Sequence, residues 1–227
     1  MTPALEVIVT TLADAQAAER GGADRLELVA AMEADGLLPD LTLVAQVRNA
    51  VALPARVMLR SRPGFGTDAS ELATLCRAAE RLRAAGIDEF VFGFLTDDGR
   101  LDIPAIRTLC AAAAPRRWTL HRAFDQVLDA QQAWATCREL PGLDLVLSAG
   151  GRAGIADGLA QLCHRAAWQT AGLHWLAGGG LRAEHVPQLR AAGITQFHSG
   201  RAVRRGGRWE EPVDETLLRQ LKQAVLA

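Results

Sequence analysis

Short apolar runs alternate with longer amphipathic runs along the whole chain. Each short run predicts a strand, and each is followed by a segment with the hydrophobic spacing of a helix. The predicted strands cover residues 5–9, 25–29, 56–60, 89–95, 118–124, 145–148, 174–177 and 196–198. Helical runs at 156–171, 183–192 and 214–227 follow the last three strands. The chain is therefore built from a repeated strand-helix unit.

Polar residues that suit helix N-termini mark the starts of the earlier helices. The candidate caps are Thr11 with Asp14, Asp40, Asp68 with Glu71, Asp102, and Asp129 with Gln132. The three pairs have the spacing of a capping box, in which the first side chain accepts a hydrogen bond from the third residue of the helix. Each predicted helix therefore begins shortly after a predicted strand.

Eight such units predict an α/β fold, a single-domain (β/α)8 TIM barrel over residues 1–227. A doubly wound open sheet shows the same alternation of elements. The count of eight units, spaced roughly 20 to 35 residues apart, favours the barrel. No Gly-x-Gly-x-x-Gly follows the first strand, which removes the strongest argument for a dinucleotide-binding sheet.

Composition narrows the classes of partner. The net charge is −1, from 25 basic and 26 acidic residues spread along the chain, which argues against a nucleic-acid or membrane-surface partner. Cysteines stand at positions 76, 110, 137 and 163, all inside helical patterns and without a Cys-x-x-Cys pair, so neither a zinc site nor a disulfide framework is indicated. The apolar run at 5–9 is too short for a signal sequence or a membrane span, and we expect a cytoplasmic protein.

Charged side chains stand on strands that are otherwise apolar. They are Glu6, Glu27, Arg60, His121 and His198. Side chains alternate across a strand, so Glu27 is expected to face the barrel axis with Arg25, and His121 with Thr119. Glu6 and Glu27 are equally well explained as members of an ion-pair network with Arg25, because buried charges must be paired.

His121 is the strongest candidate for chemistry. It lies in the string Thr119-Leu120-His121-Arg122-Ala123-Phe124-Asp125 at the end of the fifth predicted strand. Asp125 is expected to orient the imidazole and raise its pKa toward neutrality, as a general acid or base requires. Glu27 or Glu6 would supply the partner carboxylate. The alternative is a core histidine that is hydrogen-bonded to the backbone.

A second group of residues suits the binding of a small anion. It comprises Arg60, Arg62, Arg122, Gly179, Gly180, His198 and Ser199. Glycine-rich loops after the seventh and eighth strands are where many TIM barrels hold a phosphate. The alternative is that the glycines only allow a tight turn into the next helix.

The chain resembles the CutC family, known as the copper homeostasis proteins, nearly from end to end. The matching stretches are Leu5-Glu6-Val7, Gly22-Ala23-Asp24-Arg25-Leu26-Glu27-Leu28, Gly36-Leu37-Leu38-Pro39, Leu59-Arg60, Asp98-Gly99 with Asp102, Leu120-His121-Arg122-Ala123-Phe124-Asp125, Gly178-Gly179-Gly180 and Phe197-His198-Ser199. The resemblance implies a cytoplasmic TIM barrel that forms a homodimer or small homo-oligomer.

The family label also implies copper, bound as Cu(I) by cysteine thiols. The positions that match those thiols are Ile8 and Val29 in this chain, and neither side chain is a metal ligand. Met32 and Met58 are the only thioethers expected near the barrel mouth. Copper is therefore implied by the family label alone, and we assign no metal ligand and no other cofactor from the sequence.

Three functions follow as hypotheses, and the sequence leaves open whether the protein is an enzyme. The first is a copper homeostasis role, as the resemblance implies. The second is a lyase, isomerase or hydrolase that acts on a small phosphorylated or otherwise anionic substrate, with His121 as general acid or base. The third, an interaction module, has the least support, because no exposed recognition stripe is evident.

Overall fold

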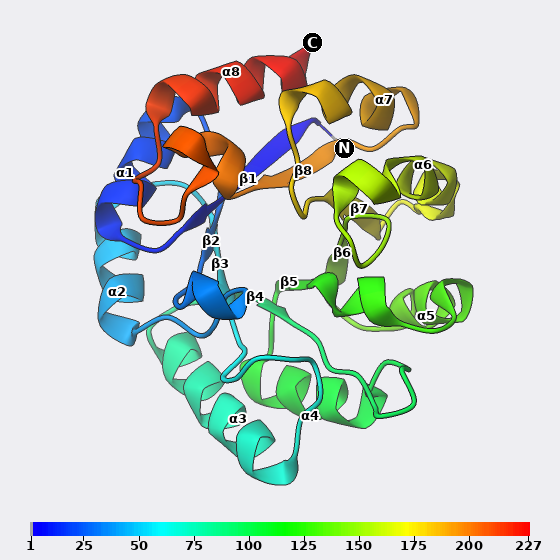
Figure 1. Cartoon of the computed structure of the whole chain (residues 1–227). Helices are drawn as coiled ribbons and strands as arrows, with labels where there is room; N and C mark the ends of the chain where they lie inside the picture. Colours follow the sequence, from blue (N-terminus) through cyan, green and yellow to red (C-terminus); the bar gives the residue numbers. More distant parts are fainter. Residues whose placement is uncertain (1) are drawn as a thin grey trace.

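A computed structural model describes residues 2–227 and shows a closed parallel barrel with strand order β1 to β8 (Figure 1). The strands are β1 (Ala4–Val9), β2 (Arg25–Leu28), β3 (Ala55–Met58), β4 (Glu89–Phe92), β5 (Arg117–Leu120), β6 (Leu143–Ser148), β7 (His174–Ala177) and β8 (Gln196–Ser199). The ring closes where β1 pairs with β8, with Glu6 opposite His198. The predicted TIM barrel is confirmed.

Eight helices surround the barrel in the part of the chain that the structure describes. They are α1 (Leu12–Gly21), α2 (Leu41–Ala50), α3 (Ala69–Ala84), α4 (Ile103–Ala113), α5 (Ala130–Cys137), α6 (Ile155–Arg165), α7 (Val186–Ala191) and α8 (Glu215–Leu226). Short 3₁₀ helices occur at Met32–Ala34, Arg122–Gln126, Ala166–Trp168, Ala183–His185, Arg201–Val203 and Arg205–Gly207. The runs predicted at 156–171 and 183–192 are therefore each divided between an α-helix and a 3₁₀ turn.

The predicted caps are the observed ones. Thr11, Asp40, Asp68, Asp102 and Asp129 each accept a hydrogen bond from a backbone N–H in the first turn of the following helix. Such caps satisfy N–H groups that have no partner inside the helix. They also fix where each loop at the C-terminal end of the barrel turns back toward its helix.

Strand ends differ from the prediction, most clearly at β5. The apolar run at 118–124 predicts a single strand, but β5 ends at Leu120 and residues Arg122–Gln126 form a 3₁₀ helix. His121 is the N-cap of this turn, because its Nδ1 accepts a hydrogen bond from the N–H of Ala123. The apolar pattern continues past the strand because Ala123 and Phe124 are buried in the turn.

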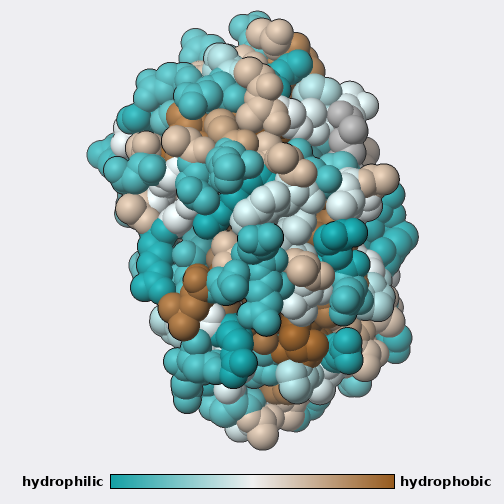
Figure 2. Space-filling model, turned by 90° about the vertical axis from the view of Figure 1, so that its right-hand side faces the viewer, coloured by the Kyte–Doolittle hydropathy of each residue, from teal (hydrophilic) through white to brown (hydrophobic). Residues whose placement is uncertain are grey.

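The main core lies between the outer faces of the strands and the helices, where aromatic rings pack in stacked and edge-on pairs. Phe92 and Trp118 stack with centroids 4.2 Å apart, and Trp134 and Trp175 with centroids 4.0 Å apart. On the face shown in Figure 2 hydrophilic residues dominate, and apolar residues form small separate patches. No helix within residues 2–227 is long and apolar enough to cross a membrane.

Candidate functional site

Charged side chains form one layer inside the barrel. Glu6, Glu27, Arg56 and Glu89 come from β1 to β4 and are all at least 95 % buried. Strand alternation places them on the barrel axis side, together with Arg25, Thr119 and His198. The predicted inward direction of Glu27 is therefore consistent with the contacts that follow.

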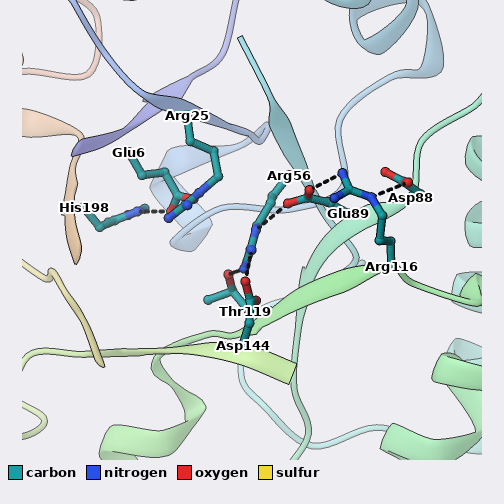
Figure 3. A network of polar contacts seen from close by, with 9 residues as sticks. All are labelled: Glu6, Arg25, Arg56, Asp88, Glu89, Arg116, Thr119, Asp144 and His198. Carbon is teal, nitrogen blue, oxygen red and sulfur yellow. Dashed lines mark hydrogen bonds and ion pairs between the residues drawn. The ribbon is translucent and has the colours of Figure 1, made fainter. Parts of the chain in front are cut away.

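His198 lies between two carboxylates in this layer. Its Nδ1 is 2.8 Å from Oε1 of Glu6, and its Nε2 is 3.8 Å from Oε2 of Glu27. The other oxygen of Glu6 accepts a hydrogen bond from Nε of Arg25. Figure 3 shows Glu6 held between Arg25 and His198. The group contains two carboxylates and one arginine. Its net charge therefore depends on whether Glu27 and His198 carry a proton.

The pKa values of the two carboxyl groups are shifted in opposite directions. Burial alone would raise the pKa of Glu6, but Arg25 and the hydrogen bond with His198 outweigh it and hold that pKa well below its usual range. Burial raises the pKa of Glu27 to about 7, against the opposing attraction of His198. Burial would lower the pKa of His198, but Glu27 and Glu6 raise it. The pKa values of Glu27 and His198 are therefore linked, because each group stabilises the charge of the other.

Arg56 links the other side of the layer. Its guanidinium lies 3.1 Å from Glu89, donates to Thr119 at 2.6 Å and pairs with Asp144 at 2.7 Å, so it joins β3 to β4, β5 and β6 (Figure 3). Arg116 adds a second cation to Glu89 at 2.5 Å. This network of paired charges is the structural alternative that the sequence left open, and Arg56 and Glu89 were missed as its members. The sequence could have indicated them through strand alternation, because Arg56 stands two residues before Met58 and Glu89 two residues before Val91, on the same face of each strand.

An apolar layer lies next along the barrel toward the C-terminal ends of the strands. Ile8, Val29, Met58 and Val91 form a buried cluster, and each stands two residues after a member of the charged layer. Met32 and Trp209 pack against this cluster from the loops. Glu6 and Glu27 thus lie on the inner side of an apolar layer, which separates them from the mouth and from His121. The expectation that one of them is the partner carboxylate of His121 is therefore wrong. His198, expected to bind an anion, lies instead between these two carboxylates.

His121 lies beyond that layer, at the level of Arg60 and Gly93. A Cβ at position 93 would lie 2.4 Å from the side chain of Leu120 and 3.2 Å from Nδ1 of the imidazole, so glycine leaves room for both. Phe65, from the loop after β3, packs on the imidazole with centroids 4.9 Å apart. Burial and the charge of Arg60 lower the pKa of His121 to about 3. The ring is neutral, and because Nδ1 accepts from Ala123 the proton resides on Nε2.

Asp125 does not orient His121, contrary to the sequence-based expectation. Its carboxylate accepts hydrogen bonds from the hydroxyl of Ser148 at 2.5 Å, the N–H of Ala149 at 3.0 Å and Nε of Arg122 at 2.9 Å. The 3₁₀ turn after His121 directs Asp125 toward the β6 loop instead of the imidazole. The expected rise of the His121 pKa is also wrong, because burial and Arg60 act on the ring without a neighbouring carboxylate.

The predicted arginines hold loops together. Arg60 donates to the carbonyl oxygens of Ala34, Asp35, Gly36 and Gly64. Arg62 is an exposed side chain that pairs with Asp68 at 2.7 Å and Glu71 at 2.8 Å. Arg122 donates to the carbonyl oxygens of Gly151 and Arg152 besides its pair with Asp125. Each of these guanidinium groups is therefore already engaged by partners within the protein.

The glycine and serine candidates are spread over the β7 and β8 loops. Gly179 and Gly180 have φ of +81° and +92°, and a Cβ at Gly179 would lie 2.9 Å from that of Ala149. The steric explanation of these glycines is therefore supported by the geometry. Ser199 follows the inward-facing His198 and so faces the helices, where its buried hydroxyl has no hydrogen-bond partner within residues 2–227.

A hollow of about 240 Å³ lies at the rim of the C-terminal end of the barrel. It is lined by Phe65, Gly66, Leu95, Thr96, Asp97, Gly99, Gln126 and Arg152 from the loops after β3, β4, β5 and β6. Phe65 separates this hollow from the ring of His121. Arg152 is exposed and donates only to the carbonyl oxygen of Gln126, forming no ion pair among residues 2–227. Arg152 was missed from the sequence because it lies in a loop without a recognisable motif.

The residues at the barrel mouth do not fit a thiolate site for copper. Ile8 and Val29 are part of the apolar layer and offer no donor atom. Cys76, Cys110, Cys137 and Cys163 lie on α3 to α6, outside the barrel. Among residues 2–227, no three side chains of His, Cys, Asp or Glu are grouped so that they could hold a metal ion.

Comparison with known proteins places the chain in a family. The model of the CutC family matches residues 3–203. A protein of Klebsiella pneumoniae (strain 342) named as a family protein CutC is 37% identical over 207 residues, which are 90% of this chain and 81% of that protein. A relative from strain ATCC 700721 / MGH 78578 of Klebsiella pneumoniae, with the same name, is 36% identical over 197 residues, covering 86% of this chain and 78% of the relative.

Solved structures show the same fold. The crystal structure of a protein described as the putative copper homeostasis protein CutC from Streptococcus agalactiae has a TM-score of 0.79 at 22% identity, over 88% of this chain and 98% of that one. Orotidine 5′-phosphate decarboxylase from Pyrococcus horikoshii OT3 has a TM-score of 0.64 at 11% identity, over 98% of this chain and 99% of that one. From the family match and the two relatives, the chain belongs to the CutC family.

Proposed function

We propose that the protein is an enzyme that acts on a small anionic substrate at the C-terminal end of the barrel. The observation that carries the proposal is the hydrogen bond that the N–H of Ala123 donates to Nδ1 of His121, which leaves the ring proton on Nε2. Burial and Arg60 lower the pKa of the ring to about 3 and so favour its neutral form. A neutral imidazole that donates from Nε2 suits an oxygen on which negative charge develops during reaction. His121 then acts as a donor to substrate, and a general-base role falls outside this geometry.

Arg152 is the anion-binding residue in this proposal. It lines the rim hollow, is exposed, and has no carboxylate partner among the described residues. Arg60, Arg62 and Arg122 are weaker candidates because their guanidinium groups are engaged by carbonyl oxygens or carboxylates. In this proposal the substrate enters at the hollow, and the ring of Phe65, which packs on the imidazole, must move aside for it to reach His121.

The side chains available favour proton transfer over covalent catalysis. Lys222, the single lysine of the chain, lies on α8 outside the barrel and pairs with Asp24, so it is not placed to form a Schiff base at the mouth. The cysteines lie on helices outside the barrel. We therefore favour an isomerase or lyase reaction that passes through an oxyanion. Asp97, an exposed carboxylate that lines the hollow, would accept the substrate proton, and Nε2–H of His121 would donate a hydrogen bond to the oxyanion.

Two measurements test the proposal. Ring ¹⁵N shifts of His121 are followed while inorganic phosphate or ribose 5-phosphate is added, and small phosphorylated aldehydes and ketones are incubated in D₂O and examined for enzyme-dependent exchange beside the carbonyl. We expect binding that weakens in Arg152→Gln and exchange that is lost in His121→Gln, while the exposed-site variant His164→Gln behaves as wild type. The absence of both a His121 response and exchange would refute the proposal.

A second candidate function is copper homeostasis, the role for which the Streptococcus agalactiae protein is named. Two thioethers favour it, because Met58 belongs to the apolar layer and Met32 packs against it. Thioether sulfur is a ligand that suits Cu(I). Anaerobic titration with Cu(I) tests this role, and we expect it to fail if the double variant Met32→Leu, Met58→Leu binds as tightly as wild type.

Oligomeric state and location are further parts of the proposal. We infer a homodimer or small homo-oligomer in the cytoplasm, as the family resemblance implies. Light scattering on a size-exclusion column determines the mass in solution, and a monomer at micromolar concentration would contradict the first inference. Fractionation of cells that express the full-length protein tests the second.

A further inference from the structure

A cavity of about 360 Å³ lies on the flank of the barrel, behind the start of β3. Its apolar wall is formed by Leu28, Val44, Val47, Val51, Val57 and Ile87. Polar groups gather at its other side, from Arg48, Asp88, Glu89 and Arg116. Its volume falls in the range of sites for small molecules, and its lining combines an apolar side with a polar one. It is separate from the mouth, because β3 and the barrel interior lie between them.

The cavity exists because α2 and α3 are not packed together. Helix α2 packs against α1, and α3 packs against α4, whereas α2 and α3 have little contact with each other. Arg48, from the last turn of α2, spans the space and donates to the carbonyl oxygen of Ala85 at the end of α3. Gly86 makes room for this guanidinium, since a Cβ at that position would lie 2.6 Å from it.

Two arginines and two carboxylates line the cavity, and they differ in how they are paired. Arg116 lies 2.8 Å from Asp88 and 2.5 Å from Glu89, and Glu89 also pairs with Arg56. Each carboxylate at the cavity is therefore already matched by a cation. Arg48 differs, because it bonds only to a carbonyl oxygen and forms no ion pair among residues 2–227. A guanidinium has five N–H donors, so most of its donors stay available to a ligand.

We propose that this flank cavity is a binding site for a small apolar carboxylate, held by its hydrocarbon part against the valines of α2 and by its carboxylate on Arg48. The apolar side favours a ligand with a hydrocarbon part, and Arg48 is the lining cation that has no carboxylate partner among residues 2–227. The volume is too small for a helix of a partner protein, which is about 10 Å across with its side chains. Ligand occupancy would join α2 to the end of α3.

Isothermal titration of the full chain with octanoate tests this site, with octan-1-ol and butyrate as comparison ligands. We expect octanoate to bind more tightly than either, since octanol lacks the charge and butyrate lacks most of the apolar surface. Arg48→Gln is expected to weaken octanoate binding about tenfold, and Arg48→Lys to restore part of it. Val47→Trp fills the cavity and is expected to abolish binding.

Arg77→Gln is the matched control, because Arg77 is an exposed arginine on α3 that bonds only to Thr74. It is expected to bind octanoate as wild type does. The proposal would be overturned if octanoate does not bind at millimolar concentration, or if octan-1-ol binds equally well. It would also be overturned if Arg77→Gln weakens octanoate binding as much as Arg48→Gln does. A change of oligomeric state in Arg48→Gln without any octanoate binding would also overturn it, since a second copy of the chain would then be the occupant.

Discussion

The backbone N–H of Ala123 donates a hydrogen bond to Nδ1 of His121 at 3.3 Å. This contact ends β5, caps the 3₁₀ turn that follows, and leaves the imidazole proton on Nε2. The same residue that suggested catalysis in the sequence therefore also has a local structural role. The effect of a substitution at His121 must therefore be measured on activity and on stability.

The neutral state of His121 predicts a loss of stability in acid. Its pKa is lowered from 6.5 to about 3, so between these values the unfolded chain binds a proton that the folded protein does not. The free energy of unfolding contributed by this group is fully present above pH 6.5 and is lost as the pH falls toward 3. We expect the ring ¹⁵N shifts to report an Nε2–H tautomer throughout this window.

Urea unfolding at a series of pH values measures the consequence. His121→Gln is expected to lose less stability between about pH 6 and pH 4 than wild type, whereas His164→Gln follows the wild-type curve because His164 is exposed. An imidazole that titrates near pH 6 in the folded protein would show that the burial of His121 is less complete than the structure indicates.

Glu27 predicts the opposite dependence on pH. Its pKa is raised from 4.5 to about 7, so in this interval the folded protein holds a proton that the unfolded chain has released. The free energy of unfolding therefore falls as the pH rises through the window, by about 3 kcal/mol in all. Glu27→Gln removes this loss, and we expect it to be more stable relative to wild type at pH 8 than at pH 5.

Denaturant titrations of both proteins across the window check this prediction. Glu33→Gln serves as the control, because Glu33 is a carboxylate of the 3₁₀ helix at Met32–Ala34, outside the charged layer. If the difference between Glu27→Gln and wild type is constant with pH, Glu27 is ionised in the folded protein and its proton is not shared with His198.

Removal of Arg56 is expected to destabilise the barrel strongly. Arg56 is 1% exposed and contacts Glu89, Thr119 and Asp144 from three other strands. Arg56→Met leaves two carboxylates without this partner, and breaking a buried pair in this way costs about 3–5 kcal/mol. The exposed-site change Arg77→Met is expected to cost less than about 0.5 kcal/mol. Similar unfolding free energies for the two variants would contradict the structural role of the network.

Strand alternation was sufficient to predict the inward direction of Glu27. It works there because every second side chain of a barrel strand faces the axis, whatever its chemistry. The same rule applies to Arg56 and Glu89, which were passed over because each stands near the start of its strand. In a barrel, a charged residue at the first position of a short apolar run should therefore also be considered a candidate for the interior.

Alternation fails where the strand ends. Asp125 was assigned to the side of His121 by counting residues, but the 3₁₀ turn breaks the period of two and sends the carboxylate to Ser148. The partners of Arg60 could not be predicted from the sequence either, because they are carbonyl oxygens of loops whose conformation depends on the closed barrel. Sequence patterns therefore located the mouth of the barrel better than the contacts within it.

Gly150→Ala is expected to unfold the loop after β6, because two backbones meet there without space for a side chain. A Cβ at position 150 would lie 1.9 Å from the carbonyl oxygen of Gly158, and φ is +83°. Gly64→Ala is the control that separates the cost of backbone strain from the cost of the steric clash. Gly64 has a similar φ of +85°, but no atom lies within 4 Å of the added carbon. Backbone strain alone costs about 1–2 kcal/mol. We expect Gly150→Ala to cost clearly more than Gly64→Ala in urea unfolding, and equal costs would mean that the α6 N-terminus moves freely away from the loop.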